Sequence, residues 1–367
     1  MGQRECALEN LVSSWQGRRV FLTGHTGFKG GWLALWVARL GAQVRGYALD
    51  PATQPNLFTV AGVGSVLDDV RGDILDRSRL EAALQEFAPE MVFHLAAQPL
   101  VRRSYADPLG TYATNVMGTA HVLEAVRKTP SVRAVVCITT DKCYENREWV
   151  WPYRETDALG GHDPYSSSKA CAEIVSAAYR SSFFSVEQAG KSRVLLATAR
   201  AGNVIGGGDW SEDRLIPDLI RGFQTGKPVL IRRPQAIRPW QHVLDPLHGY
   251  ILLAEKLLAG EAQFAAAFNF GPGDEDAWTV EEIADSLAAA WGDGARWVRD
   301  AEPGVHEAGV LRLDASKARA ELAWRPRLKL ESALRWTAEW YRACLNRTHM
   351  SDFTWKQIEE YVRLQDS

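Results

Sequence analysis

The segment Thr23-Gly-His-Thr-Gly-Phe-Lys-Gly30 decides the fold of this chain. The apolar run Arg19–Leu22 before it predicts a short strand, and the run Gly31–Leu40 after it predicts a helix. The three glycines of the segment let the backbone approach a ligand, and a helix N-terminus offers unpaired N–H groups and a partial positive charge. We therefore expect a diphosphate to bind here. An ordinary strand-to-helix turn is the alternative interpretation.

A carboxylate follows the next predicted strand, Val44–Leu49, at Asp50. A dinucleotide-binding unit places an acidic residue about 20 residues beyond its glycine turn, where it accepts a hydrogen bond from a ribose 2′-OH. An aspartate there would repel a 2′-phosphate, so Asp50 favours NAD over NADP. Because Pro51 comes next, Asp50 can also be read as a turn residue.

Length and composition describe a globular protein. The 367 residues are 46% hydrophobic and 24% charged, which argues against disorder and allows a large core with two lobes. The net charge of -3 gives no basic surface, so we expect no nucleic-acid partner. No apolar run approaches the length of a membrane span, and the first residues lack the pattern of a secretion signal, so we expect neither feature. The five cysteines lack metal-ligand spacing, so we expect a reduced, cytoplasmic protein without a metal site.

Strand and helix patterns alternate through the first half of the chain. After Asp50 we predict strands over residues 65–69, 91–95, 132–138 and 193–199, and helices over 77–87, 111–128 and 163–180. Repeated strand-then-helix units with short connections predict an α/β fold, a doubly wound parallel sheet of the Rossmann type.

The pattern of predicted elements changes after Gly206, where glycine- and proline-rich segments separate shorter helices and strands. We therefore predict a dinucleotide-binding domain over residues 15–204, with a return segment at about 245–272. Residues 205–244 and 273–350 are predicted to form a smaller, C-terminal substrate lobe.

The strongest chemical signal is the pair Tyr165 and Lys169 in Tyr-Ser-Ser-Ser-Lys. Four residues apart on a helix, the phenol and the ammonium share one face. An ammonium beside a phenol favours the phenolate and lowers its pKa, so the phenolate can remove a proton from a sugar hydroxyl. A surface pair on an amphipathic helix is the alternative.

Polar groups also follow the predicted buried strands, where ligands of open α/β sheets bind. Thr140, Asp141 and Lys142 come directly after the predicted strand 132–138, where the alternative is a polar turn. Weaker candidates are Ala96, Ala97 and Gln98 under a nicotinamide, Asp73 near an adenine amine or in a turn, Asn115 on the preceding helix, Asn203 for sugar or phosphate, and Arg238 for a diphosphate or a structural role.

Together these motifs resemble the nucleotide-sugar 4,6-dehydratases of the extended short-chain dehydrogenase/reductase family, and within it most closely the branch that acts on CDP-glucose. The resemblance covers about residues 15–345. It is carried by the segments 23–30, His94–Arg102, Thr139–Asn146, Asp163–Lys169, Arg200–Trp210 and Arg238–His242.

The resemblance implies an NAD-dependent lyase that converts CDP-glucose into CDP-4-keto-6-deoxyglucose and water. By analogy Tyr165 and Thr140 act at the C4 oxygen, with Lys169 beside them, and Asp141 is the acid at C6. The related TDP-glucose enzymes have a glutamate where this chain has Lys142, so Lys142 is the positional match for the base at C5. A lysine acts as a base only if its pKa is strongly lowered.

The resemblance also implies which residues hold the ligands. The expected NAD-binding set is Gly24, Thr26, Gly27, Phe28, Lys29, Gly30, Asp50, Asp73, Ile74, Leu95, Ala96, Ala97, Asn115, Tyr165 and Lys169. The expected substrate-binding set is Gln98, Arg102, Asn203 and Arg238. A homodimer or homotetramer and a role in deoxysugar biosynthesis, as for lipopolysaccharide O-antigen, are further expectations.

Two other functions use the same fold. A sugar-nucleotide 4-epimerase would share Tyr165 and Lys169 but would not need Asp141 and Lys142 to eliminate water. A dinucleotide-sensing regulatory protein would have no need for Tyr165, Lys169 and Asp141 at once. A 4,6-dehydratase for another nucleotide sugar also stays open.

Overall fold

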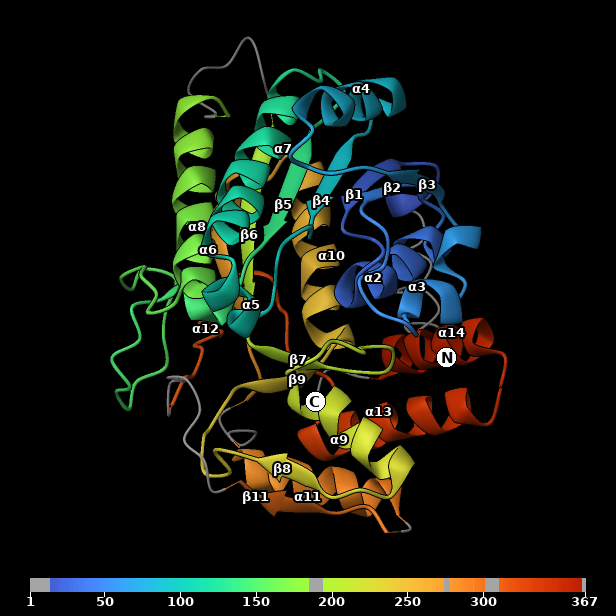
Figure 1. Ribbon diagram of the computed structural model, residues 1–367. Helices are drawn as coiled ribbons and strands as arrows, with labels where there is room; N and C mark the ends of the chain where they lie inside the picture. Colours follow the sequence, from blue (N-terminus) through green and yellow to red (C-terminus); the bar gives the residue numbers. More distant parts are fainter. Residues whose placement is uncertain (1–13, 185–193, 274–277, 293, 301–309, 365–367) are drawn as a thin grey trace.

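A seven-stranded sheet lies at the centre of the protein, in the order β10-β6-β5-β4-β1-β2-β3 (Figure 1). Every neighbouring pair of these strands is parallel, which confirms the predicted doubly wound fold class. The computed structural model describes residues 14–184, 194–273, 278–292, 294–300 and 310–364. The strands are β1 (Arg19–Thr23), β2 (Gln43–Ala48), β3 (Asp68–Arg71), β4 (Met91–His94), β5 (Ala134–Ile138), β6 (Leu195–Ala201) and β10 (Ala267–Phe270).

Helices cover both faces of this sheet. Alternate side chains of β1 show the division, because Val20 and Leu22 pack in the cluster that contains Trp32, whereas Phe21 packs in the cluster that contains Leu80. Burial on both faces explains why the strands are nearly continuous apolar runs. One face is covered by α2 (Phe28–Arg39) and α10 (Leu244–Leu258), and the other by α4 (Arg77–Phe87), α7 (Gly118–Arg127) and α8 (Pro164–Ser182).

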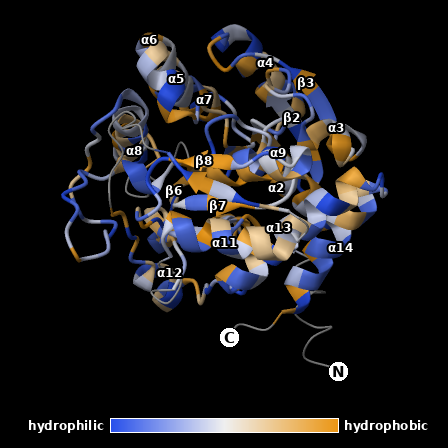
Figure 2. Ribbon diagram, turned by 60° about the horizontal axis from the view of Figure 1, so that its bottom comes forward, coloured by the Kyte–Doolittle hydropathy of each residue, from blue (hydrophilic) through white to orange (hydrophobic). Residues whose placement is uncertain are grey.

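A smaller lobe lies beside the carboxyl ends of the strands (Figure 1). It contains two short parallel pairs, β8 (Val229–Ile231) with β11 (Trp297–Arg299) and β7 (Asn203–Ile205) with β9 (Trp240–His242). Its helices are α9 (Leu215–Thr225), α11 (Val280–Trp291) and α13 (Leu330–Leu345). In Figure 2 strand β8 is hydrophobic, whereas α13 and α14 (Met350–Arg363) combine hydrophilic and hydrophobic residues, as expected of helices with one buried face.

Helix α14 connects the lobe to the sheet domain. Trp340 of α13 donates a 2.9 Å hydrogen bond from Nε1 to Thr354 of α14, and the Tyr361 ring of α14 lies 5.6 Å from the Trp36 ring of α2. The remaining helices are α3 (Leu57–Val60), α5 (Val101–Ala106), α6 (Pro108–Tyr112) and α12 (Ser316–Glu321). Among the described residues, no helix is both long and apolar enough to cross a membrane.

Several predicted boundaries are wrong. Helix α2 begins at Phe28 rather than at residue 31, because Gly27 takes the N-cap position and the last part of the glycine turn becomes helical. Strand β3 starts at Asp68 rather than residue 65, because Gly62, with φ of 65°, begins a 3₁₀ turn over Val63–Ser65. Strand β6 runs to Ala201, two residues beyond the prediction. Its predicted first residue, at position 193, lies outside the described residues.

The predicted long helix over residues 111–128 is interrupted. Helix α6 ends at Tyr112, a wide π-helical turn covers Ala113–Met117, and α7 begins at Gly118. The turn contains Asn115, whose side chain bonds across to neighbouring segments. Such wide turns are frequent at functional sites.

Candidate active site

The carboxyl ends of the strands and the smaller lobe enclose a cavity of about 2060 Å³. This exceeds the roughly 300–1,000 Å³ of a pocket for one small molecule, so the cavity has room for a dinucleotide and a second ligand. The predicted site residues that line it are Gly24, Thr26, Gly27, Phe28, Lys29, Gly30, Asp50, Asp73, Ile74, Leu95, Ala96, Ala97, Gln98, Arg102, Thr140, Lys142, Tyr165, Lys169, Asn203 and Arg238. Two predicted residues, Asp141 and Asn115, do not reach the cavity wall.

The glycine turn is closely packed against its own backbone. A Cβ atom on Gly24, whose φ is 82°, would lie 2.8 Å from the Ala96 nitrogen, and one on Gly30 would lie 2.1 Å from the Gly24 carbonyl oxygen. Gly27 caps α2 without a side-chain hydrogen bond, so the first N–H groups of the helix face the cavity unshielded. This geometry fits the diphosphate of a dinucleotide.

The two predicted acidic residues on this side differ in their surroundings. The Asp50 side chain is 90% exposed and lies 3.6 Å from Arg71, so it is accessible to a ribose hydroxyl at the cavity rim. Asp73 lines the cavity, but its Oδ1 also accepts a 2.9 Å hydrogen bond from the Leu75 N–H. Asp73 therefore has the turn role that the sequence left open, alongside its place in the wall.

Tyr165 is buried at the cavity wall and forms a hydrogen bond with Thr140. Burial raises the pKa of Tyr165 to about 12, which the Thr140 bond only partly offsets. Lys169 does not lower the pKa of Tyr165 as expected, because the Lys169 ammonium instead donates a 3.2 Å hydrogen bond to the Ile138 carbonyl. Burial lowers the pKa of Lys169 to about 8. The phenol is thus protonated in this state.

Asp141 and Lys142 extend the polar chain from Tyr165. Thr140 donates a 2.9 Å hydrogen bond to Asp141 Oδ1, and the Lys142 ammonium lies 3.6 Å from the same oxygen. Lys142 Nζ also donates to Asn203 Oδ1 at 3.2 Å. Asp141 is fully buried, and no described residue hydrogen-bonds its second oxygen, Oδ2. The carboxylate therefore lies behind the cavity wall, where proton exchange with the cavity has to pass through Thr140 or Lys142.

Asn115 and Gln98 bond to each other rather than leaving their amides free for ligands. The Asn115 side chain accepts from the Gln98 N–H at 2.8 Å and donates to the Gln98 carbonyl and to Ser168. The Gln98 amide donates to Thr111 at 2.9 Å. In this structure the Asn115 amide fixes the loop after β4, and its predicted contact with the cofactor stays a prediction.

The predicted cations lie at different depths. Arg102 is paired with Asp213 at 2.7 Å at the cavity rim. Arg238 is buried, and it donates a 2.9 Å hydrogen bond to the Ile237 carbonyl. Lys29, in the first turn of α2, has its pKa lowered to about 7 by burial and then by Arg214. The two arginines contribute the positive charge that a diphosphate requires, and Lys29 adds to it when it is protonated.

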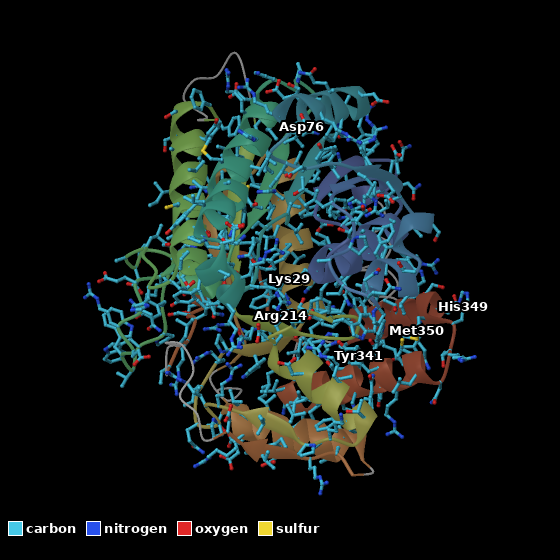
Figure 3. The ribbon with its side chains drawn as sticks, in the orientation of Figure 1. Lys29, Asp76, Arg214, Tyr341, His349 and Met350 are labelled. Atoms are coloured by element: carbon cyan, nitrogen blue, oxygen red, sulfur yellow. The ribbon has the colours of Figure 1, made fainter. Side chains whose placement is uncertain are left out.

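Arg214 was missed by the sequence reasoning. It lines the cavity from the lobe, next to Lys29 in Figure 3, and its charge acts on both Lys29 and Tyr165. Asp209 holds it by a 2.7 Å ion pair. The only signal in the sequence was a basic residue directly after Glu212 and Asp213.

The site contains no metal centre within the described residues, where no group of three or more histidine, cysteine or acidic side chains is arranged to hold an ion. The arrangement instead offers a phenol, an ammonium, a hydroxyl and an acid–amine pair around one cavity. Groups of these kinds can transfer protons, and a glycine turn with cations beside it can bind phosphates.

Comparisons with known proteins agree with this picture. The chain is 52% identical over 348 residues to the CDP-glucose 4,6-dehydratase of Salmonella typhimurium, covering 95% of this chain and 97% of that protein. It is 26% identical to the dTDP-glucose 4,6-dehydratase of the same organism, covering 89% and 93% of the two chains.

Solved structures show the same fold. The UDP-glucose 4-epimerase of Thermotoga maritima has a TM-score of 0.76 at 23% identity, with 89% of this chain and 99% of that chain covered. The dTDP-glucose 4,6-dehydratase of Bacillus anthracis, solved with NAD, has a TM-score of 0.73 at 22% identity, with 89% and 97% covered. At these identities the likeness establishes the fold alone.

A family model decides the membership. The model described as GDP-mannose 4,6 dehydratase matches residues 21–337, which include the glycine turn and all of the cavity wall except Tyr341, Cys344 and Leu345 of α13. Together with the 52% identity, this match shows that the chain belongs to the GDP-mannose 4,6 dehydratase family.

Proposed function

We propose that this protein is an NAD-dependent nucleotide-sugar 4,6-dehydratase that converts CDP-glucose into CDP-4-keto-6-deoxyglucose and water. The observation that carries the proposal is the 52% identity, over 95% of the chain, to a CDP-glucose 4,6-dehydratase. The glycine turn would hold the NAD diphosphate, and Asp50 would accept from its ribose. When bound there, NAD would supply reversible hydride transfer, and the overall reaction would have no net redox change.

The side chains of the cavity supply the proton transfers. Tyr165 acts at the C4 oxygen, and Thr140 holds the phenol by the hydrogen bond already formed between them. Because burial raises the pKa of Tyr165 to about 12, the phenol needs a positive charge bound beside it before it can act as a base near neutral pH. Lys169 positions the ligands from the same face of α8.

Loss of water requires one proton to leave C5 and another to reach the C6 oxygen. We assign these transfers to Lys142 and Asp141, whose side chains lie 3.6 Å apart. Transfer of one proton from the Lys142 ammonium to the Asp141 carboxylate within this ion pair would supply the amine base and the carboxylic acid that the two steps require. The Lys142 bond to Asn203 then orients the amine toward the cavity wall.

The test is incubation with CDP-glucose, TDP-glucose, UDP-glucose and GDP-mannose, followed by mass spectrometry for loss of one water. Substrate carrying deuterium at C4 should give product with deuterium at C6. Formation of the C4 epimer without loss of water would establish a 4-epimerase instead. Asp141→Asn and Lys142→Met should oxidise C4 but stall, so NADH absorbance should appear and persist. If both variants dehydrate at the wild-type rate, the pair has only a structural role.

The domain division is also part of this proposal. Residues 15–204, with the return segment at about 245–272, would bind NAD, and residues 205–244 and 273–350 would bind the sugar nucleotide. In support, β10 of the return segment pairs with β6 of the sheet. Limited proteolysis with and without CDP-glucose tests it, since substrate should protect the second set of residues.

We further propose a cytoplasmic homodimer or homotetramer that serves deoxysugar synthesis, including that of O-antigen. The described cysteines are all free, as in a reduced compartment. Large hydrophobic side chains are exposed along α5 to α8, at Tyr105, Leu109, Tyr112, Met117 and Ile174. A second copy of the chain would cover this face. Light scattering of the wild type and of Leu109→Glu tests the assembly, and a monomeric wild type would refute it.

A further inference from the structure

A third side chain shares the active-site face of α8. Glu173 follows Lys169 by one turn, just as Lys169 follows Tyr165 by one turn. Each of the three contacts the end of β5. Tyr165 bonds to Thr140, the Lys169 ammonium bonds to the residue 138 carbonyl, and the Glu173 carboxylate accepts from Thr139. Three successive turns of one helix thus hold three consecutive residues of the strand end.

The Glu173 carboxylate is buried and fully bonded. Its Oε1 accepts from the Thr139 hydroxyl, and its Oε2 accepts from the Thr198 hydroxyl at 2.7 Å and from Arg200 Nη2 at 2.8 Å. Only 3% of Glu173 and 3% of Arg200 is exposed. A buried ion pair costs desolvation, so it is weak evidence for stability, and its position beneath the active site asks for another explanation.

Arg200 extends the network away from α8. Its Nη1 donates to the Tyr144 hydroxyl at 2.8 Å, and its guanidinium lies 5.0 Å from the Tyr144 ring centre. Tyr144 in turn donates to Asn269 Oδ1 at 2.7 Å. The segment that carries the acid–amine pair, residues 141–142, is therefore fixed on both sides, at Thr139 by Glu173 and at Tyr144 by Arg200.

The carboxylate also acts on Lys169 through its charge. Burial lowers the pKa of Lys169, and the negative charge of Glu173 opposes that effect. The other titratable groups that face Lys169 are Cys137 of β5 and Cys143 after it, which also oppose the lowering, together with His94 of β4 and Lys29 of α2. The thiols are protonated near neutral pH, since burial raises the pKa of both. Glu173 is then the only negative charge among these groups.

We propose that Glu173, held by Arg200, is a positioning residue for the dehydratase site: it fixes the strand end that carries Thr140, Asp141 and Lys142 against α8, and it balances the positive charge of Lys169. The inference rests on the proposed function where turnover is measured. The protonation of Lys169 can be measured without catalysis.

The test compares Glu173→Gln, which keeps the shape and removes the charge, with Glu173→Asp, which keeps the charge and shortens the reach. Pulsed acetylation of Lys169, followed by mass spectrometry across pH, reports its protonation without any substrate. The midpoint should fall by about one pH unit in Glu173→Gln, within the range expected for loss of an opposite charge. It should stay near the wild-type value in Glu173→Asp.

Turnover of CDP-glucose gives the second readout. Both variants should lose at least about tenfold in kcat, because a small misplacement of reacting groups is costly. Only Glu173→Gln should also move the alkaline limb of the pH profile to lower pH. Glu255→Gln is the matched control, since Glu255 is a part-buried carboxylate bonded to Ser14 and Trp15 far from the cavity. The Glu255→Gln substitution should lower the melting temperature, but it should change neither the midpoint of Lys169 acetylation nor the alkaline limb of the pH profile.

The inference would be overturned if both Glu173 variants had the same Lys169 acetylation midpoint and the same turnover as the wild type. A uniform loss of kcat at every pH, with unchanged midpoints, would reduce Glu173 to a structural residue and also overturn it. If Glu173→Gln does not fold, the test uses Glu173→Asp and Arg200→Lys instead. Their kcat values are compared with that of the wild type under conditions in which the same fraction of each protein is folded. If the wild type itself does not dehydrate CDP-glucose, the proposed function is wrong. The acetylation experiment still tests the effect of Glu173 on Lys169.

Discussion

A single methyl group at Gly30 tests whether the glycine turn holds the cofactor. The added Cβ of Gly30→Ala would lie 2.1 Å from the Gly24 carbonyl oxygen, so the two backbone segments must separate by about 1 Å or more to restore normal contact. Overpacking of this kind costs about 1–3 kcal/mol of stability. The same shift moves the α2 N–H groups away from a diphosphate, and we expect NAD affinity to fall by about 10²-fold, or about 2.7 kcal/mol.

Gly260→Ala provides a control of similar stability cost. Gly260 has φ of 84° with open space around it, so alanine there adds only backbone strain, about 1–2 kcal/mol. Isothermal titration with NAD and thermal melting separate the two effects. Both variants should melt at a lower temperature, but only Gly30→Ala should lose NAD affinity. Wild-type NAD affinity in Gly30→Ala would show that the turn does not hold the diphosphate.

Three further outcomes are expected. Asp50→Ala should narrow the preference for NAD over NADP by about 1.5–3 kcal/mol, measured as paired dissociation constants, and tighter NADP binding in the wild type would contradict the role of Asp50. Tyr165→Phe should lose about 10²–10⁴-fold in kcat with an unchanged melting curve, and near-full activity would refute the assignment. Burial raises the pKa of Asp245 to about 7, so the folded state keeps a proton that the unfolded chain releases above its ordinary pKa of 3.8. Stability should therefore rise as the pH falls from about 7 to about 4, and Asp245→Asn should remove this dependence, by up to about 4 kcal/mol at pH 8 in melting or denaturant experiments. A pH dependence that survives in Asp245→Asn would assign it to other groups.

The sequence predicted those parts of the site that are local. The strand, glycine turn and helix around Gly24 form one contiguous segment, and Tyr165 and Lys169 share a face by helical spacing alone. Nearly all the predicted residues line one cavity because the carboxyl ends of parallel strands meet at one edge of the sheet. Their individual roles stay predictions.

The features that the sequence did not predict depend on contacts between distant segments. Asn115 lies on the predicted helix, but a wide turn directs its amide to Gln98 and Ser168, which no spacing rule indicates. The pKa of Tyr165 depends on how deeply the folded lobe buries it, and Arg214 reaches it from that lobe. Glu173 could have been found, because it continues the four-residue spacing of Tyr165 and Lys169.

The order in which the strands are synthesised differs from their order in the sheet. Six of the seven strands are complete at Ala201, but β10, which pairs with β6, begins only at Ala267. Until then the edge of β6, all of whose residues are buried in the finished protein, has no partner and is open to pairing with another chain. At about 5–20 residues per second, the nascent chain remains in this aggregation-prone state for about 3–13 s, even before the lobe folds. A shortened chain that ends before Ala267 would keep the open edge permanently and should aggregate rather than form a separate dinucleotide-binding domain.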